Sequence, residues 1–492
     1  MSDQQATTSR TGDDAPGPDP RRWRILGVTL VIGFMALLDV TIVNVAIPSM
    51  RVGLHTSTST VQWVVSGYAL TFGLTLVTGG RLGDAYGRRR MMLIGLVGFV
   101  VTSAAVGLAP GAAWVIAARL LQGAAAGLLT PQNTGLIQQL FRGPERGRAF
   151  GLFGLTVSIS SGLGPVIGGL IISTAGEANG WRYLFLVNVP IGLVAMVFVA
   201  RLVPGRSHEE GEQEGAPATG RTQLDLAGAL LLGGGVLCLL FPLVSIESGA
   251  RWPLVLLIGA PLFLWGFVRW ERRVRRRGQP PLLDVSLLRQ TAGYANGLAV
   301  GALYFLGFTG IFLVLSVYFQ DGLGLSPLRA GLLLTPFAVG SAFTAPLAGR
   351  LVSRIHRLIT VLALSVMMTG VLLAALLVPG HAGPGLWVVA VPTLLLAGLG
   401  GGGVVSPNIT LTLAEVPNRM AGAAGGALQT GQRIGSSIGA ALLMTVYGVV
   451  SSAGPETALR AALFTSLGVL GLAMAMAVRS LVREGRPDPG RD

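Results

Sequence analysis

Long apolar stretches separated by short polar segments dominate the pattern of this chain. Each stretch has about the 20 residues that an α-helix needs to cross the hydrocarbon core of a bilayer. Because lipid offers the backbone no hydrogen-bond partners, each is predicted to be a membrane-spanning helix. The pattern therefore predicts an all-α polytopic membrane protein with 14 transmembrane helices. The stretches lie at residues 25–47, 61–80, 91–109, 112–134, 149–172, 183–202, 225–245, 253–270, 294–319, 329–349, 358–378, 386–408, 421–447 and 459–481.

The composition excludes several classes of protein. Hydrophobic residues make up 51% of the 492 residues and charged residues 12%, against roughly 25% charged in an ordinary soluble domain. A soluble enzyme of this composition would expose too much apolar surface. The sequence contains no Lys, so the Gly-x-x-x-x-Gly-Lys phosphate loop of an ATP-driven pump cannot be present. No metal-ligand cluster or nucleophile–base pair stands out, and no enzyme activity, cofactor or metal site is predicted.

The positive charge follows the predicted topology. All 36 basic residues are Arg, and the net charge is +14. Threading the helices from a cytoplasmic N-terminus places 29 Arg inside and five outside. This bias predicts that both termini are cytoplasmic. The charge is therefore interpreted as a sidedness signal rather than a nucleic-acid surface, and it favours anionic lipid of the inner leaflet.

The first and last parts of the chain repeat each other weakly. Gly80-Arg81-Leu82 follows the second stretch, and Gly349-Arg350-Leu351 follows the tenth. Similar matches at offsets of 269 to 276 residues relate stretches 1–6 to stretches 9–14. The chain is thus predicted to have six helices, an inserted pair and six helices. Two parallel six-helix halves are the layout of major facilitator transporters.

Domain boundaries follow from the same pattern. The expected parts are a disordered cytoplasmic N-terminus at 1–23, a six-helix bundle at 24–202, a cytoplasmic linker at 203–224, the inserted helix pair at 225–270, a basic cytoplasmic loop at 271–293, a second six-helix bundle at 294–482 and a cytoplasmic tail at 483–492.

A sequence rich in Gly and Arg joins the second and third stretches. Gly83 and Gly87 allow a tight turn and the close approach of another helix. Asp84 can pair with an Arg or cap a helix N-terminus. A loop that served only to keep positive charge inside would not need this spacing of Gly and Asp. The whole motif reads Gly80-Arg81-Leu82-Gly83-Asp84-Ala85-Tyr86-Gly87-Arg88-Arg89-Arg90.

Asp39 is the only carboxylate well inside an apolar stretch. An ionised Asp in hydrocarbon costs at least a few kcal/mol, so we expect it to face the bundle interior. There it can take up and release a proton, or it can form a structural hydrogen bond to a neighbouring helix. Arg119 in the fourth stretch reaches a similar depth, given the helical rise of about 1.5 Å per residue. Arg119 is therefore a predicted neighbour of Asp39, and the alternative is that it snorkels to the outer interface.

Two further groups lie in predicted helices. The fifth stretch contains Gly162-Leu163-Gly164-Pro165-Val166-Ile167-Gly168-Gly169, in which Pro165 is expected to kink the helix and the glycines to let another helix pack closely. The thirteenth contains Gln429, Gln432 and Arg433 near its middle. These three residues either line a cavity or form interhelical hydrogen bonds.

Together these motifs resemble the fourteen-helix drug:proton antiporters of the major facilitator superfamily, the EmrB/QacA type. The resemblance covers nearly the whole chain. It includes the sequence 38–48 in the first stretch, the Arg-x-x-Gln-Gly sequence from Arg119, and 181–190 at the start of the sixth stretch. Unlike some exporters of divalent cations, the chain shows no second intramembrane acid around its tenth stretch.

The resemblance implies a role for each group of residues. Asp39 and Arg119 would couple transport to protons. A conformational latch would involve Gly80, Arg81, Gly83, Asp84, Gly87, Arg88 and Arg89. The antiporter motif would be formed by Gly164, Pro165, Gly168 and Gly169. Residues expected in a substrate cavity are Asn44, Gln62, Trp63, Tyr68, Gln122, Gln429, Gln432 and Arg433.

The resemblance also implies a function. The chain would be a monomer in the bacterial cytoplasmic membrane that exports small hydrophobic or amphipathic drugs in exchange for protons, with the proton gradient as its energy source. A dedicated exporter of an endogenous metabolite or self-made antibiotic is the main alternative. A proton-coupled nutrient importer is less favoured, because the Gly-Pro sequence of the fifth stretch is typical of antiporters. A non-transporting membrane receptor is less favoured, because it would leave the Asp39 and Arg119 pair unexplained.

Overall fold

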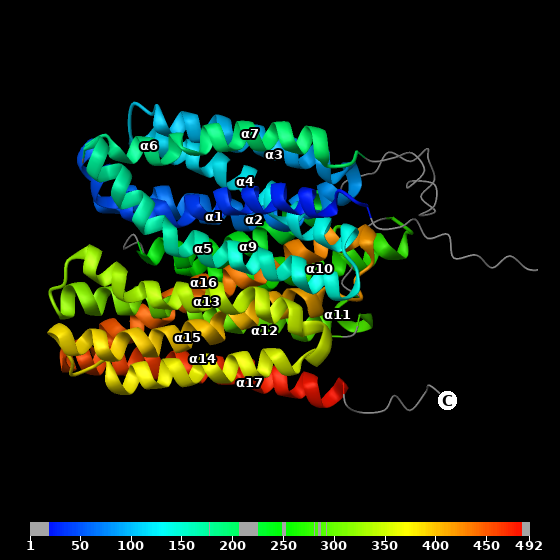
Figure 1. Cartoon of the computed structure of the whole chain (residues 1–492). Helices are drawn as coiled ribbons and strands as arrows, with labels where there is room; N and C mark the ends of the chain where they lie inside the picture. Colours follow the sequence, from blue (N-terminus) through cyan, green and yellow to red (C-terminus); the bar gives the residue numbers. More distant parts are fainter. Residues whose placement is uncertain are drawn as a thin grey trace, which may run out of the picture.

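The structure is a computed structural model that describes residues 19–176, 178–205, 225–247, 252–279, 281–283, 287–291 and 293–484. Every regular element within these ranges is helical, and the helices run side by side (Figure 1). Most of the predicted N-terminal segment, of the 203–224 linker and of the C-terminal tail lies outside the described residues.

The first half of the chain forms six predicted spans from seven helices. Gly180–Leu202 is one span made of two helices, with a break at Val187. Pro190 explains the break, because it has no N–H to donate to the carbonyl of Leu186. The helices are α1 (Arg22–Gly53), α2 (Thr58–Tyr86), α3 (Arg88–Gly107), α4 (Ala112–Leu140), α5 (Gly143–Ala175), α6 (Gly180–Leu186) and α7 (Asn188–Leu202).

The rest of the chain supplies the other spans. Thirteen spans in the described ranges are long and apolar enough to cross a membrane, whereas the seventh predicted span, in α9, has a shorter described apolar stretch, Leu226–Pro242. The elements are α9 (Leu226–Glu247), η1 (Trp252–Ile258), α10 (Gly259–Arg276), α11 (Leu287–Gln290), α12 (Tyr294–Val317), η2 (Tyr318–Gly322), α13 (Pro327–Ile355), α14 (Leu358–Leu377), α15 (Gly383–Thr412), η3 (Asn418–Met420), α16 (Ala421–Val450), η4 (Ser451–Ala453) and α17 (Pro455–Glu484).

The end of α10 differs from the sequence prediction. A loop was expected from residue 271, but the helix continues through Arg276. Phe267, Glu271 and Val274 lie one turn apart and are all buried. A buried stripe at this spacing keeps a segment helical even where its other face carries several Arg residues.

The helices form two packed groups with a seam between them (Figure 1). Helices α1 to α7 pack on one another, and so do α12 to α17. The seam joins α2 to α16 and α5 to α13. Of the inserted pair, α9 lies against α2 and α16, and α10 packs on α9. Because α2 and α13 are equivalent in the internal repeat, the two contacts α2–α16 and α13–α5 are also equivalent.

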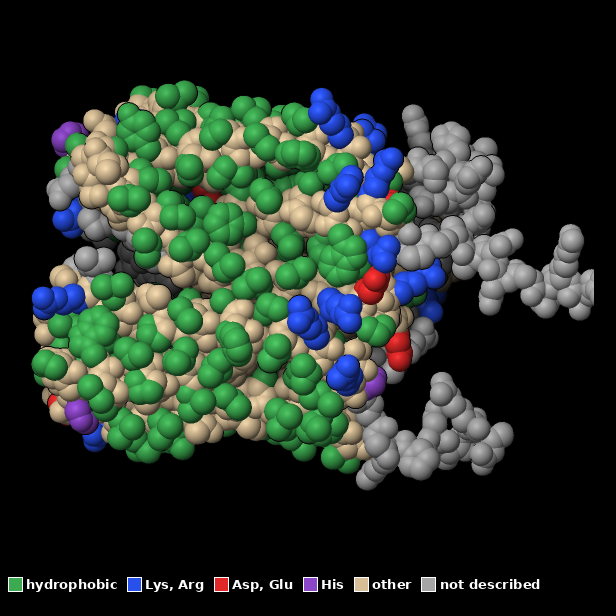
Figure 2. All heavy atoms as spheres, viewed as in Figure 1, with side chains coloured by type: hydrophobic (Ala, Val, Ile, Leu, Met, Phe, Trp, Pro, Cys, Tyr) green, Lys and Arg blue, Asp and Glu red, His purple; other side chains and the backbone are tan. Residues whose placement is uncertain are grey.

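Apolar and positively charged side chains occupy different parts of the surface, as is expected of a membrane protein. Figure 2 shows apolar side chains over the flank of the bundle and Arg side chains gathered mainly at the end where α1 begins and α17 ends. Exposed apolar residues include Leu121, Leu170 and Phe343, each more than 60% exposed. The protein is therefore a multi-pass membrane protein, since only lipid can cover such a belt favourably.

The two halves touch tightly near the Arg-rich end. A Cβ atom at Gly80 of α2 would overlap the carbonyl oxygen of Gly422 in α16, and one at Gly349 of α13 would overlap Gly147 of α5. Gly80 and Gly349 are the glycines of the repeated Gly-Arg-Leu sequence. At the opposite end, Figure 2 shows a hollow between the halves. The bundle is thus closed at one end and open at the other.

Candidate functional site

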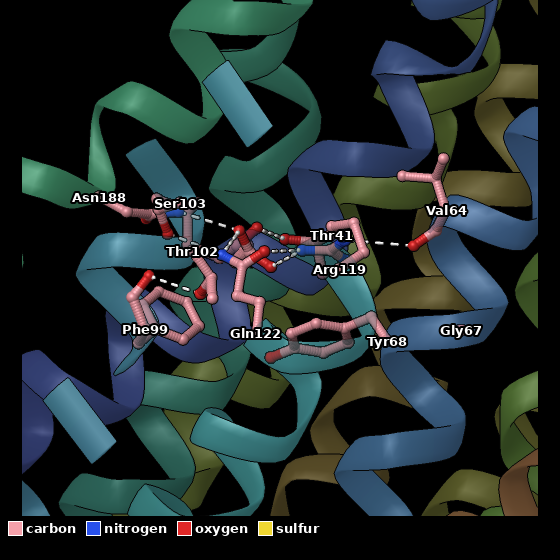
Figure 3. Close-up of polar contacts among 12 residues, drawn as sticks. Thr41, Val64, Gly67, Tyr68, Phe99, Thr102, Ser103, Arg119, Gln122 and Asn188 are labelled. Atoms are coloured by element: carbon pink, nitrogen blue, oxygen red, sulfur yellow. Dashed lines mark hydrogen bonds and ion pairs between the residues drawn. The ribbon is translucent and has the colours of Figure 1, made fainter. Parts of the chain in front are cut away.

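Asp39 is buried in the first half and contacts Arg119, Gln122 and Asn188. These three partners are labelled in Figure 3. The side chain of Asp39 is 0% exposed, and that of Arg119 is 1% exposed. Arg119 Nη1 lies 2.5 Å from Asp39 Oδ2. The two residues therefore form a fully buried ion pair between α1 and α4, as their depths in the sequence suggested.

Two amide side chains complete the surroundings of the carboxylate. Gln122 Nε2 donates to Asp39 Oδ1 at 3.2 Å, and Asn188 Nδ2 donates to the same oxygen at 2.9 Å. Gln122 also accepts from Arg119 Nη1 at 2.8 Å and lies 2.7 Å from the hydroxyl of Ser103. A buried ion pair is tolerated when such additional hydrogen bonds satisfy its remaining atoms. We call these five residues the Asp39 cluster.

Arg119 is held from all sides inside the bundle. Its Nε donates to the carbonyl of Val64 at 3.1 Å, and its guanidinium carbon lies 4.1 Å from the centre of the Tyr68 ring. The centre of the Phe185 ring lies 5.3 Å from the same guanidinium carbon. The alternative that Arg119 snorkels to the outer interface is therefore wrong, because its side chain is buried and its Nε and Nη1 donate to partners within the bundle.

Two members of the cluster were missed by the sequence analysis. Asn188 begins α7 directly after the break at Val187, and Ser103 follows Thr102 in the buried part of α3. Asn188 belongs to the segment that resembles the start of the family's helix 6. A polar side chain at a proline-induced break in an apolar span was the signal that could have identified it.

Tyr68 connects this cluster with the other half of the protein. Its ring stacks on Phe72, with the ring centres 5.9 Å apart. On the far side of the seam, the guanidinium carbon of Arg433 in α16 lies 4.6 Å from the centre of the Phe72 ring. Tyr68, Phe72 and the two arginines thus form a continuous row from α4 across α2 to α16.

The other predicted cavity residues are placed differently. Trp63 packs against Phe241 of α9 with ring centres 5.6 Å apart, so it contacts the inserted pair. Gln429 and Gln432 are half-buried in α16, and Gln429 Nε2 has no hydrogen-bond partner. The side chains of Asn44 and Gln62 lie outside the described residues.

The loop motif joins the halves at the closed end. Asp84 Oδ1 accepts from the backbone N–H of Gly422 at 3.1 Å, and Oδ2 accepts from that of Ala423 at 3.0 Å. The carboxylate therefore caps the N-terminus of α16, where the helix dipole favours a negative charge. Arg88 Nη2 lies 3.3 Å from Asp84 and also donates to the carbonyl of Asn418 at 3.2 Å.

The remaining motif residues shape this contact within the first half. Gly87 has a φ of 93° between α2 and α3, a conformation that favours glycine. A Cβ at Gly83 would overlap the side chain of Gln132 in α4. Arg89 donates to the carbonyl of Ala200. Arg81 makes no hydrogen bond or ion pair within the described ranges.

The glycines of the α5 motif differ in how closely they pack against other helices. Gly164 lies against Thr41 of α1, and Thr41 Oγ1 donates to the carbonyl of Ser160 at 3.1 Å. A Cβ at Gly169 would meet no atom within 4 Å. Gly168 is buried, and the side chain of Pro165 lies outside the described residues. Close packing by this motif is therefore seen at Gly164 and is absent at Gly169.

Asp84→Asn is expected to weaken the closed end. The substitution removes a charge from the N-terminus of α16 and one acceptor oxygen, which is worth about 1–2 kcal/mol. The population in which the two halves are separated at this end should rise about five- to thirty-fold relative to the population in which they touch. Distances between spin labels at this end of the two halves report the change.

Glu145→Gln is the control, because it breaks the Arg22–Glu145 ion pair at the same end within one half. Equal distance distributions for Asp84→Asn and wild type would contradict the capping role.

Comparison with known proteins identifies the family. The sequence profile of the Major Facilitator Superfamily matches residues 29–440. The chain is 40% identical over 452 residues to the probable actinorhodin transporter of Streptomyces coelicolor, covering 88% of this chain and 75% of that protein. It is 37% identical over 436 residues to the puromycin resistance protein pur8 of Streptomyces alboniger, covering 87% and 82%.

Solved structures agree on the fold. The human organic anion transporter MFSD10 (TETRAN) superimposes with a TM-score of 0.68 at 18% identity, over 93% of this chain and all of the other. At this identity the likeness shows the fold alone. With a matching profile over most of its length and close relatives that are transporters, this chain belongs to the major facilitator superfamily of membrane transporters and is not an enzyme.

Proposed function

We propose that this protein is a proton-coupled exporter of small hydrophobic or amphipathic drug-like compounds in the bacterial cytoplasmic membrane. It acts as a monomer with both termini in the cytoplasm and 14 spans arranged as six, two and six. The observation that carries the proposal is the buried Asp39–Arg119 pair, with Gln122 and Asn188 on the same carboxylate. A carboxylate at this depth is costly, and such residues in membrane spans typically serve ion or proton transfer.

In this mechanism Asp39 exchanges one partner for another. The carboxylate binds Arg119 when ionised and a proton when the open end admits one from outside. Protonation removes the negative charge from the pair, and Arg119 keeps its contacts with Val64, Gln122 and the rings of Tyr68 and Phe185. Because Tyr68 continues through Phe72 to Arg433, a shift of Arg119 is transmitted to the seam between the halves.

The loop motif supplies the second element of the mechanism. Asp84 holds α16 at the cytoplasmic end while the opposite end is open. Release of this cap would let the halves separate on the cytoplasmic side and admit a compound there. The alternation between the two states then moves the compound out and a proton in.

The names of the relatives favour antibiotics as the class of exported compound. One relative carries the name actinorhodin transporter, one puromycin resistance protein, and a third, from Streptomyces glaucescens, tetracenomycin C resistance and export protein. These names also favour the second candidate, a dedicated exporter of a self-made antibiotic or other endogenous metabolite. The breadth of the exported compounds distinguishes the two.

Expression of the full chain in a host that lacks its own drug pumps tests the proposal. Tolerance to at least one hydrophobic antibiotic should rise about tenfold or more, and a protonophore should abolish the lower accumulation of that compound. Protection against one compound alone would favour the dedicated exporter. Accumulation unchanged by the chain across a broad panel, with the protein present in the membrane, would refute export.

A further inference from the structure

Arg433 differs from Arg119 in forming no ion pair with any residue that the structure describes. It lies in the middle of α16, half-buried, and its one described contact is with the face of the Phe72 ring. No ion pair within the described residues includes it. Arg119, at the other end of the same row, has an acid, an amide and a carbonyl.

A cation without a counter-ion inside a membrane span is costly. Translocon scales give about 2.5–3.5 kcal/mol for Arg at the centre of a helix. The described acids of the second half lie at helix ends or in loops, at Asp321, Glu415 and Glu456, so none of them neutralises Arg433. The Asp39–Arg119 pair carries no net charge when Asp39 is ionised. The seam therefore presents one uncompensated positive charge.

The surroundings of Arg433 provide further hydrogen-bond donors. Gln429 lies one turn earlier on the same face of α16, and its Nε2 has no hydrogen-bond partner. The planar guanidinium presents several N–H groups in a fixed fork that matches a carboxylate. The rings of Phe72 and Tyr68 form a flat apolar wall beside it. The combination suits an acidic oxygen joined to an aromatic body.

We propose that Arg433, with Gln429, binds an acidic group of the exported compound, a carboxylate or an ionised phenol. The proposal rests on the export function above and specifies its substrate class. The apolar body of the compound packs on Phe72, and a cationic compound of the same shape is repelled by Arg433.

Binding of pyrenebutyrate and its uncharged methyl ester tests the proposal. The full chain is used in lipid nanodiscs, as wild type, Arg433→Gln, Arg433→Lys and Arg460→Gln. Wild type should bind the acid about tenfold or more tightly than the ester, as a charge-assisted hydrogen bond allows. Arg433→Gln should lose this preference and leave ester binding unchanged. Arg433→Lys should retain part of it, because the charge remains without the fork. Arg460→Gln, which removes one exposed positive charge elsewhere, should behave as wild type.

Thermal unfolding separates recognition from a structural role. Arg433→Gln removes an unpaired cation, so its melting temperature should equal or exceed that of wild type. A lower melting temperature together with equal losses for acid and ester would assign Arg433 to the fold and overturn the proposal. An acid preference that survives in Arg433→Gln, or no acid preference in wild type, would also overturn it. Absence of proton-driven export with the acid preference intact would refute the proposed function alone.

Discussion

Asp39→Asn is expected to abolish proton-driven export while the protein still reaches the membrane. Asn has nearly the shape of Asp and keeps one oxygen for Arg119, but it binds no proton. In proteoliposomes with an imposed pH gradient, wild type should accumulate an exported compound against its gradient. The variant should only equilibrate the compound, so the gradient-dependent component falls to zero.

The same substitution has a cost in stability that must be measured alongside. Removing one partner of a buried ion pair costs about 3–5 kcal/mol when the other charge is left unsatisfied. Asn reduces this cost because Val64, Gln122 and Tyr68 still hold Arg119. Asp321→Asn is the matched control, since the same change occurs at an exposed carboxylate in η2. Undiminished proton-linked transport by Asp39→Asn would refute the role of Asp39.

Gly80→Val is expected to prevent closure of the Arg-rich end of the bundle. Any Cβ at this position overlaps the backbone of Gly422, and neither helix backbone can yield as a flexible side chain would. Overpacking of this kind costs about 1–3 kcal/mol. The cost falls only on the state in which α2 touches α16, so that state should become about five- to 150-fold less populated. Transport should fall with it.

The internal repeat provides a second test of the same contact. Gly349→Val should have a similar effect, because a Cβ at Gly349 would overlap the backbone of Gly147 in α5. Gly448→Val is the control in α16, where a Cβ would meet no atom within 4 Å. The measurement is labelling of a cysteine introduced at the Arg-rich end, in a background without Cys238. Wild-type labelling and transport in Gly80→Val would show that the close approach is not needed.

The sequence by itself determined that the chain is a bundle of apolar helices long enough to span a membrane, and it predicts their sidedness and the internal repeat. These properties depend on a local requirement, because each backbone group in lipid must be satisfied within its own helix. The prediction of sidedness also needs only the sequence, because the number of Arg residues in each loop can be counted along the chain. Asp39 could be identified as buried for the same reason, since an acid in the middle of an apolar stretch has no exposed alternative.

The tertiary structure decided which side chains meet. Helical periodicity gives the face on which a residue lies, but not which helix covers that face. Asp84 binds backbone groups of Gly422 and Ala423, which are 338 and 339 residues away in the chain. Asn188 joins Asp39 because a proline breaks its span at the same depth. Gly164 and Gly169 belong to one motif, yet only Gly164 is covered, because contact with α1 lies on one side of α5. The isolation of Arg433 also emerges only from packing, since no described acid on the helices that pack against α16 forms an ion pair with it.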